Sequence, residues 1–257
     1  MRALVTGAGG RLGRAMAIRL AELGHDVAVH YDSSREGAEE TAEAIRALGR
    51  RAETLQADLL DHDQTVGLVP RASEALGGPL TVLVNNASIF AYDSLASASA
   101  ESWERNVGSN LRAPVFLTQA FAAQAPEAET DARGEKRARA CVVNMLDQRI
   151  EKLTPHYMTY TLGKMGLWAF TQTAARALAP HVRVNGIAPG TTLIGANQSQ
   201  AQFEAQRAAT VLERGSNPED VTEALAYLVR TPAVTGQALI VDGGQHLGWQ
   251  TPDILTP

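Results

Sequence analysis

Two side chains four residues apart, Tyr160 and Lys164 in TYTLGK, are the residues of this sequence best suited to acid–base chemistry. The apolar residues around them recur at helical spacing, so both side chains are expected on one face of a helix. A tyrosine titrates at about pH 10, and a neighbouring ammonium stabilises the phenolate, which lowers the pKa of the phenol and makes it a usable proton donor. The alternative is a helix with a core tyrosine and a solvated lysine.

An acidic residue, Asp147, stands thirteen residues before Tyr160, just after the apolar run ACVVNM. A hydroxyl would donate a hydrogen bond to the alkoxide that forms during ketone reduction, whereas an ionised carboxylate cannot. Reduction of a ring C=N bond differs, because the nitrogen must gain a proton while hydride reaches the carbon. Asp147 could relay that proton with Tyr160 or accept hydrogen bonds from the N–H groups of a heterocycle. The alternative is that Asp147 caps a turn and leaves proton transfer to Tyr160.

The glycine-rich sequence TGAGGRLG, residues 6–13, lies between the first predicted strand and the first predicted helix. Backbone N–H groups and the positive end of a helix can bind a pyrophosphate in such a turn. Glycine-rich turns also occur as plain tight connections, but this one stands in the first unit of a repeated β-α series. We therefore expect Gly7, Arg11, Leu12 and Gly13 to hold a dinucleotide.

NAD binding is marked by a carboxylate at the end of the second strand, which accepts hydrogen bonds from a ribose 2′-hydroxyl. This position, counted from Gly13, is Tyr31. Donors for a 2′-phosphate lie in the glycine loop or follow the strand: Arg11, Ser33, Ser34 and Arg35. Asp32 is discordant, because a carboxylate that points inward would disfavour a phosphate. The pattern favours NADPH over NADH. The alternative for Arg35 is that it is an ordinary surface charge with no contact to the cofactor.

Short apolar runs alternate with longer amphipathic segments along the whole chain. Strands are predicted at residues 3–6, 27–31, 53–58, 80–86, 139–145, 182–187 and 238–242. Helices are predicted at about 12–23 and at 37–49, 62–76, 101–124, 156–179, 201–213 and 218–230. This alternation predicts an α/β fold, a Rossmann-type doubly wound sheet of seven parallel strands with helices on both faces.

We expect one dinucleotide-binding and catalytic domain over residues 1–257. The charged segment 126–140 is predicted to be an exposed loop with a frayed helical end. The segment 191–215 follows Pro189 and Gly190 at the carboxyl end of a strand, where open α/β sheets bind ligands, and is predicted to be a substrate lid.

The composition limits the classes of partner. A net charge of −5, a pI of about 5.7 and the lack of a basic block disfavour nucleic acid and anionic membranes, so small molecules and other copies of the chain are expected. No apolar run reaches the roughly 18 residues of a membrane span, and no targeting segment is predicted. Cys141, the only cysteine, is expected in a buried strand, which fits a reducing cytoplasm. No metal site is predicted.

Five motifs occur in a fixed order: Thr6-Gly7 with Gly13, Asn85-Asn86-Ala87, Asn110, Tyr160 with Lys164, and Pro189-Gly190. In this order and at these separations they resemble the short-chain dehydrogenase/reductase family, over essentially the whole chain. The resemblance implies that Tyr160 donates the proton, that Lys164 also holds the nicotinamide ribose, and that Asn110 orders a water in the proton relay. It implies further cofactor contacts from Asp58, Leu59, Asn86, Ala87, Ser88, Lys164, Pro189 and Gly190. It also implies a homotetramer with the 156–179 helix in an interface.

The chain departs from the usual pattern of this family in three places. Arg11 replaces the middle glycine of TGxxxGxG, and Asp147 replaces the catalytic serine. Ser88 and Phe90 stand in NNASIF, where NNAG is usual. The combination resembles the pteridine reductase branch, and bacterial dihydromonapterin reductases share parts of it. We expect a flat pterin between Phe90 and the nicotinamide, although Phe90 as plain core and Arg11 as a ligand of phosphates alone are alternatives.

The sequence therefore predicts an NADPH-dependent reductase of pterin-like substrates. The predicted catalytic residues are Asn110, Asp147, Tyr160 and Lys164. The predicted substrate contacts are Arg11, Ser88, Phe90, Asp147 and Tyr160. A short-chain carbonyl reductase acting on a 3-oxoacyl or other ketone substrate is the first alternative. A cofactor-binding sensor without catalysis is the second, and the presence of the Tyr-Lys pair disfavours it.

Overall fold

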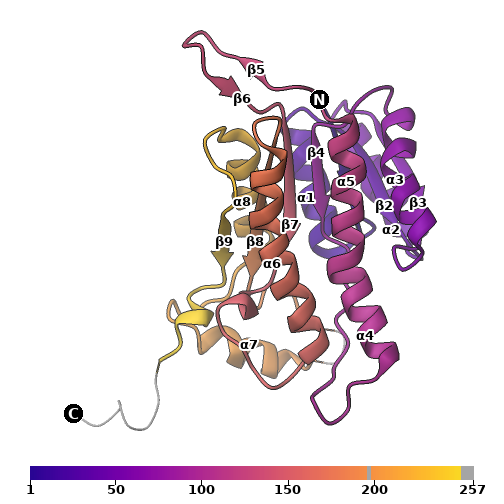
Figure 1. Ribbon diagram of the computed structural model, residues 1–257. Helices are drawn as coiled ribbons and strands as arrows, with labels where there is room; N and C mark the ends of the chain where they lie inside the picture. The colour runs from indigo at the N-terminus through magenta and orange to yellow at the C-terminus, as the bar shows by residue number, and fades with distance from the viewer. Residues whose placement is uncertain (196–197, 250–257) are drawn as a thin grey trace.

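Seven strands form one parallel sheet in the computed structural model, which describes residues 1–195 and 198–249 (Figure 1). The strands are β1 (Arg2–Val5), β2 (Asp26–Tyr31), β3 (Ala52–Gln56), β4 (Val82–Asn85), β7 (Ala140–Met145), β8 (Val182–Pro189) and β9 (Ala238–Val241). Their order is β3-β2-β1-β4-β7-β8-β9, and every neighbouring pair is parallel. The strand order reverses between β1 and β4, which opens a crevice at the carboxyl ends of the strands.

Helices cover both faces of this sheet. They are α1 (Arg11–Glu22), α2 (Arg35–Ala47), α3 (His62–Ala75), α4 (Ala100–Val107), α5 (Ala113–Gln124), α6 (Met158–Leu178), α7 (Gln200–Ala208) and α8 (Pro218–Arg230). One core cluster joins α1, α2 and α8 to the sheet around Met16 and Leu225, and the other joins α3, α5 and α6 around Leu68 and Phe121. Strands buried on both faces read as continuous apolar runs, which is why the sequence predicted this fold correctly.

The helix predicted over 101–124 is interrupted by a π-helical segment, η1 (Gly108–Arg112). The Ala113 N–H donates to the Gly108 carbonyl, five residues back. Pro114 has no N–H to donate to the Asn110 carbonyl four residues back, which explains why an ordinary α-helical register is not kept here. The uninterrupted helix was therefore wrong, and the interruption falls on the predicted catalytic residue Asn110.

The charged segment 126–140 forms a short hairpin. Strands β5 (Glu129–Thr130) and β6 (Lys136–Arg137) pair antiparallel, and Figure 1 shows them projecting beyond one end of the sheet. The Asp131 carboxylate organises the turn by accepting hydrogen bonds from the N–H groups of Arg133 and Glu135, both at 2.9 Å. The predicted exposure is correct, but the predicted helical end is wrong.

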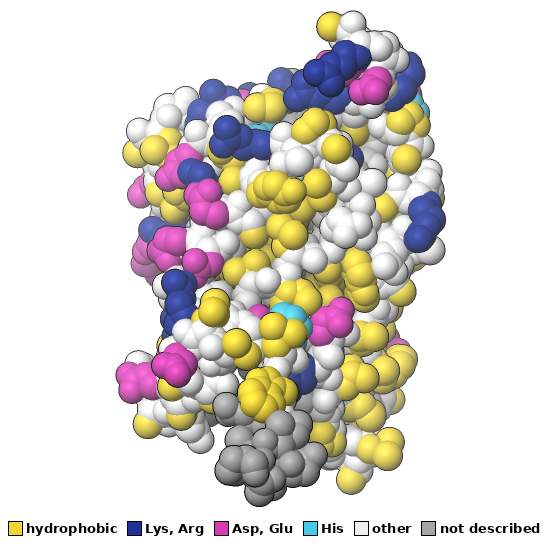
Figure 2. Space-filling view, turned by 90° about the vertical axis from the view of Figure 1, so that its left-hand side faces the viewer, with side chains coloured by type: hydrophobic (Ala, Val, Ile, Leu, Met, Phe, Trp, Pro, Cys, Tyr) yellow, Lys and Arg dark blue, Asp and Glu magenta, His cyan; other side chains and the backbone are white. Residues whose placement is uncertain are grey.

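One side of the molecule, over α8 and the edge strand β9, has apolar side chains in its middle with charges of both signs around them (Figure 2). All four residues of β9 are only partly buried, and Tyr227 on α8 is half-exposed. A partly apolar surface of this kind is suited to contact another copy of the chain, and the predicted homotetramer stays a prediction. Among the described residues no helix is both long and apolar enough to cross a membrane.

The buried imidazole of His25, directly before β2, predicts acid destabilisation. Burial, together with the charges of the N-terminus and Arg50, lowers the pKa of His25 from 6.5 to about 4. Above about pH 6.5 the group is neutral in the folded and the unfolded chain. As the pH falls from about 6.5 towards about 4, only the unfolded chain binds the proton, so the free energy of unfolding decreases.

We expect this single group to remove about 2 kcal/mol of stability between about pH 7.5 and pH 5. Urea denaturation of the wild type and of His25→Gln at both pH values measures it. The variant should lose less stability on acidification than the wild type by that amount, and an equal loss in the two proteins contradicts the assignment.

Candidate active site

The glycine-rich loop connects the carboxyl end of β1 to the first turn of α1. Gly7 has a φ of +63°, in the left-handed region that favours glycine, and a Cβ there would lie 3.0 Å from Ala87 Cα. At Gly13 a Cβ would lie 2.2 Å from the Gly7 carbonyl oxygen. The turn is therefore lined by backbone, and the first N–H groups of α1 have no intrahelical acceptors. Such a turn fits the pyrophosphate of a dinucleotide.

The loop after β4 holds this turn in place. The Thr6 hydroxyl oxygen accepts hydrogen bonds from the N–H groups of Asn86 and Ala87, both at 2.9 Å. The Asn86 side-chain amide donates to the carbonyls of Thr6 at 2.8 Å and Gly7 at 3.2 Å. Asn86 thus fixes the glycine-rich loop, and its predicted contact with the cofactor stays a prediction.

A buried histidine of β2, His30, also supports the glycine-rich loop. Its Nδ1 accepts a hydrogen bond from the Gly7 N–H at 3.0 Å, so Nε2 carries the proton and donates to the Ala57 carbonyl at 3.0 Å. Burial lowers the pKa of His30, which keeps the ring neutral. The sequence analysis missed this residue, although a histidine inside the apolar run VAVHY requires polar partners.

The residues predicted to select the 2′-group lie at the carboxyl ends of β2 and β3. β2 ends at Tyr31, and the Ser34 hydroxyl donates to the Gly9 carbonyl at 3.3 Å, which places it beside the glycine-rich loop. Asp58 and Leu59 follow β3 at the same rim. The exposed residues of this rim are Asp32, Ser33, Ser34 and Arg35. The structure therefore brings these predicted cofactor residues together.

The predicted proton donors meet between the end of β7 and the start of α6. The Tyr160 hydroxyl donates to Asp147 Oδ2 at 2.9 Å. Lys164, one helical turn further, donates from Nζ to the Met145 carbonyl at 2.7 Å and lies 5.5 Å from the centre of the Tyr160 ring. Tyr160 and Lys164 are buried, with 5% and 3% exposure. The predicted pairing of phenol, ammonium and carboxylate is therefore present.

The electrostatics of this group differ from the prediction. Burial, followed by the charge and the hydrogen bond of Asp147, raises the pKa of Tyr160 well above its ordinary value. The sequence predicted a lowered pKa for Tyr160, and that prediction is wrong because burial and the neighbouring Asp147 carboxylate both disfavour the phenolate. Burial lowers the pKa of Lys164 to about 8, against the opposing effect of Asp147. Lys164 therefore keeps most of its charge at neutral pH.

Asn110 holds the loop after β4 beside these residues. Its Oδ1 accepts a hydrogen bond from the Ser88 hydroxyl at 2.7 Å. Its Nδ2 donates to the carbonyls of Ile89 at 2.8 Å and Asn106 at 2.9 Å. The side chain of Asn110 thus orients Ser88, and its place in a water relay stays a prediction.

Phe90 offers an aromatic surface next to Tyr160. Its ring is 51% exposed, so the interpretation of Phe90 as plain core is wrong. It stacks on Tyr157 with ring centres 4.2 Å apart and an interplanar angle of 8°, and it meets Tyr160 edge-on at 4.7 Å and 80°. A flat substrate that contacts this surface would lie close to the proton donor.

Asp147 has a second charged partner, Arg149. The carboxylate caps the short 3₁₀ helix η2 (Gln148–Ile150) by accepting the Arg149 N–H at 2.9 Å, so the turn-capping alternative and the contact with Tyr160 both hold. The Arg149 guanidinium lies 3.3 and 3.4 Å from the two carboxylate oxygens. The sequence analysis missed Arg149, whose only signal was its place two residues after Asp147.

Arg11 links the glycine-rich loop to the segment after β8. It has a φ of +51°, a strained conformation for a side-chain-bearing residue, and its guanidinium donates to the Ile194 carbonyl at 3.0 Å. β8 extends through Pro189, and the Gly190 N–H donates to the Val241 carbonyl at 3.1 Å. Arg11, Pro189 and Gly190 therefore lie at the carboxyl edge of the sheet, as predicted.

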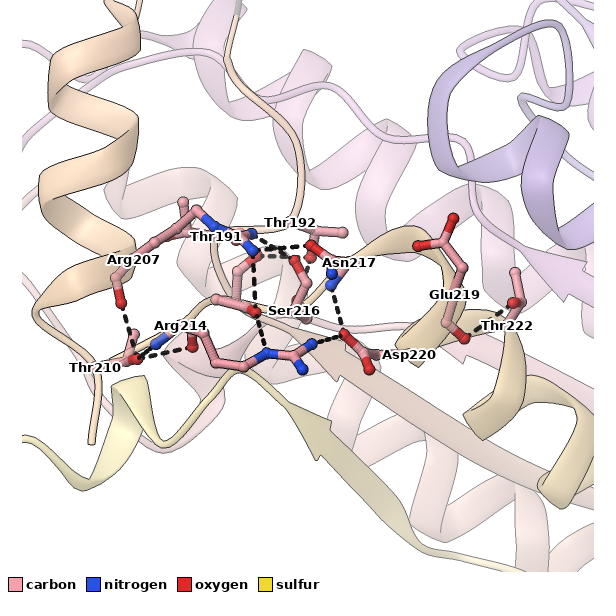
Figure 3. Close-up of polar contacts among 12 residues, drawn as sticks. Thr191, Thr192, Arg207, Thr210, Arg214, Ser216, Asn217, Glu219, Asp220 and Thr222 are labelled. Carbon is pink, nitrogen blue, oxygen red and sulfur yellow. Dashed lines mark hydrogen bonds and ion pairs between the residues drawn. The ribbon is translucent and has the colours of Figure 1, made fainter. Parts of the chain in front are cut away.

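The predicted lid 191–215 contains α7, and residues 196 and 197 of this segment lie outside the described residues. Arg207 of α7 donates to the carbonyls of Thr191 at 3.0 Å and Ser216 at 2.7 Å, and to the Asn217 side chain at 2.8 Å (Figure 3). The Thr192 and Ser216 hydroxyls are 2.5 Å apart. One guanidinium thus joins both ends of the segment, whose action as a lid stays a prediction.

The order of these elements can be compared with known families. Residues 1–205 match the family described as short chain dehydrogenase. The chain belongs to this family. This short-chain dehydrogenase is thus an NAD(P)-dependent oxidoreductase.

Its relatives have several activities by name. The structure of FolM alternative dihydrofolate reductase 1 from Brucella canis complexed with NADP is 39% identical, with a TM-score of 0.90 and 98% and 96% of the two chains covered. Pteridine reductase 1 from Leishmania tarentolae is 33% identical, over 95% of this chain and 96% of its own. A 3-oxoacyl-[acyl-carrier-protein] reductase from Staphylococcus aureus is 30% identical, over 95% and 98%.

The position of His30 in this short-chain dehydrogenase predicts that it shapes the cofactor loop. His30→Leu leaves the Gly7 N–H and the Ala57 carbonyl without their partner, at about 1–3 kcal/mol for each buried group. We expect a lower urea midpoint and a dissociation constant for NADPH raised at least about tenfold. Urea denaturation and NADPH fluorescence titration measure the two effects. Unchanged cofactor affinity would show that His30 serves stability alone.

Proposed function

We propose that this protein is an NADPH-dependent reductase of pterin-like substrates that reduces a ring C=N bond. The observation that carries the proposal is the 2.9 Å hydrogen bond from the Tyr160 hydroxyl to Asp147 Oδ2. An ionised carboxylate in this place cannot donate to a developing alkoxide, but it suits a heterocycle whose nitrogen must be protonated. Two relatives support the proposal, because one is named an alternative dihydrofolate reductase and the other a pteridine reductase.

The residues that would hold NADPH fit the cofactor. The loop from Gly7 to Gly13 has no room for side chains at its two tight positions and leaves the start of α1 free for the pyrophosphate. Lys164 would hold the nicotinamide ribose, and the 2′-phosphate would lie at the rim of Arg11, Ser33, Ser34 and Arg35. When bound, NADPH supplies the hydride. Similar structures contain NADP, from Brucella canis and from Burkholderia cenocepacia, and support NADPH over NADH.

Tyr160 would donate the proton to the substrate nitrogen. Its raised pKa keeps the phenol protonated at neutral pH, so the proton is present when the substrate binds. Loss of the proton leaves a buried phenolate, which Lys164, still mostly charged, would stabilise. Asp147, at hydrogen-bond distance from the phenol, would return a proton that comes ultimately from water.

A pterin ring would stack on the exposed surface of Phe90, next to the edge of Tyr160. Ser88 and Arg11 would contact the substrate as well as the cofactor, since one lies beside Asn110 and the other bridges to Ile194. We further propose that the protein is a homotetramer and that it is located in the cytoplasm. The resemblance to the family supports the tetramer.

Carbonyl reduction is the second candidate function. Sequence similarity favours it to the same degree, because a 3-oxoacyl-[acyl-carrier-protein] reductase from Staphylococcus aureus is 30% identical. A granaticin polyketide synthase ketoacyl reductase from Streptomyces violaceoruber is 34% identical. In that case Tyr160 alone would protonate the alkoxide, and Asp147 would serve only as the cap of η2.

Exchange of Asp147 for serine separates the two candidates. NADPH oxidation is measured with dihydrobiopterin, dihydromonapterin, dihydrofolate and an acetoacetyl thioester. We expect the wild type to reduce the pterins, and Asp147→Ser to lose about 10²-fold or more of that activity while it gains activity on the ketone, because a hydroxyl can donate to the alkoxide. A wild type that reduces only the thioester contradicts the proposal.

Removal of the phenol hydroxyl tests the proton donor. Tyr160→Phe keeps the ring that contacts Phe90 but has no proton to donate, so we expect turnover to fall below detection while the dissociation constant for NADPH changes less than about threefold. Steady-state assays and NADPH fluorescence titration measure these effects. Substantial remaining turnover would assign the proton to another group.

A further inference from the structure

The proposed reaction leaves one charged residue beside the proton donors without a role. Arg149 lies between the Asp147 carboxylate and two aromatic rings. Its Nη1 is 3.3 and 3.4 Å from the two carboxylate oxygens, and its guanidinium carbon is 5.4 Å from the ring centre of Phe90 and 5.3 Å from that of Tyr157. The side chain is mostly buried, with 20% exposure. Arg149 therefore connects the carboxylate to the aromatic surface proposed for the substrate.

The cap of η2 does not require an arginine at this position. The cap of η2 needs only the backbone N–H of residue 149, which any residue except proline supplies. The Arg149 side-chain Nε is enclosed and has no partner within the described part of the chain. A buried donor without a partner reduces stability by about 1–3 kcal/mol. The arginine thus has one enclosed donor that the cap does not use, and the case for its role rests on what its Nη1 and guanidinium face contact.

The groups around Asp147 indicate which role the Arg149 side chain can have. Oδ2 accepts from the Tyr160 hydroxyl, and Oδ1 accepts from the Arg149 N–H, while Nη1 of Arg149 lies close to both oxygens. From α6, the Lys164 ammonium also acts on the carboxylate. Lys152, on the same turn as Arg149, is directed away to the Gln245 carbonyl at 3.2 Å. Of these cations, Arg149 is the one whose side chain lies at 3.3 and 3.4 Å from the two carboxylate oxygens.

We propose that Arg149 is a positioning residue for proton transfer: its guanidinium fixes the Asp147 carboxylate with Oδ2 towards Tyr160 and holds the Phe90–Tyr157 pair beside the same phenol. This inference rests on the proposed function. A guanidinium is planar and can bind a carboxylate along its edge while its face lies over aromatic rings, whereas an ammonium cannot do both. We therefore expect lysine to replace Arg149 only in part.

A double-mutant cycle tests whether Arg149 acts through Asp147. The variants are Arg149→Gln, Asp147→Asn and the double variant, with Lys152→Gln as the matched control that removes the same charge from the same turn. We expect Arg149→Gln to lower kcat about 10- to 100-fold with little change in the KM for NADPH, and to have less than about threefold effect in the Asp147→Asn background. Lys152→Gln should stay within about twofold of the wild type.

Chemical rescue distinguishes the loss of the guanidinium group from a general loss of structure. Methylguanidinium should restore part of the turnover of Arg149→Ala, methylammonium should restore less, and Arg149→Lys should lie between the wild type and Arg149→Gln. Equal losses from Arg149→Gln in both backgrounds, or no rescue of a variant that melts like the wild type, would overturn the positioning role.

The same data separate this inference from the proposed function. A wild type that reduces pterins but shows no coupling between the two residues contradicts the role of Arg149 alone. A wild type that reduces no pterin contradicts the proposed function, and with it the proton relay on which the role of Arg149 depends.

Discussion

The hydrogen bond between a buried phenol and a carboxylate is the interaction on which the proposed chemistry depends. A carboxylate removed from water needs hydrogen-bond donors, and Asp147 has three: the Tyr160 hydroxyl, the Arg149 backbone and the Arg149 guanidinium. The charge of Asp147 in turn raises the pKa of the phenol and supports that of the Lys164 ammonium. The end of β7, the turn η2 and the first two turns of α6 must therefore be placed together for any one of these groups to function.

The parallel sheet makes this placement possible. The loops with predicted site residues all follow the carboxyl ends of strands. The glycine-rich loop follows β1, the Asn86–Phe90 segment follows β4, Asp147 follows β7, and the segment with α7 follows β8, while the loops after β2 and β3 form the rim described for the 2′-group. Hydrogen bonds from Asn86 to Gly7 and from Arg11 to Ile194 connect these loops to one another. The strand order thus brings distant parts of the sequence to one edge of the sheet, where open α/β sheets bind ligands.

The features that the sequence predicted well are those with a local physical pattern. The central strands could be predicted because burial on both faces makes them apolar runs, and the edge strands β3 and β9 because they continue the alternation with helices. Asp147 could be paired with Tyr160 because a strand end and the next helix start are neighbours in such a sheet. The hairpin β5–β6 has strands of two residues, too short for a period. The roles of His30 and Arg149, and the direction of the Tyr160 pKa, depend on where buried atoms point, which neither composition nor spacing records.

The π-helical segment η1 has a consequence for the architecture of the surrounding helices. One extra residue in a helical turn rotates everything after it by about 100° around the axis. α4 before the segment packs against α6, whereas α5 after it packs mainly against α3 and also contacts β4 and α6. The additional residue therefore lets the two halves of a nearly continuous helix turn different faces towards their main neighbours, α6 for α4 and α3 for α5. A single deletion between Gly108 and Arg112 would bring the two halves back into phase and make their packing faces incompatible with the partners they have.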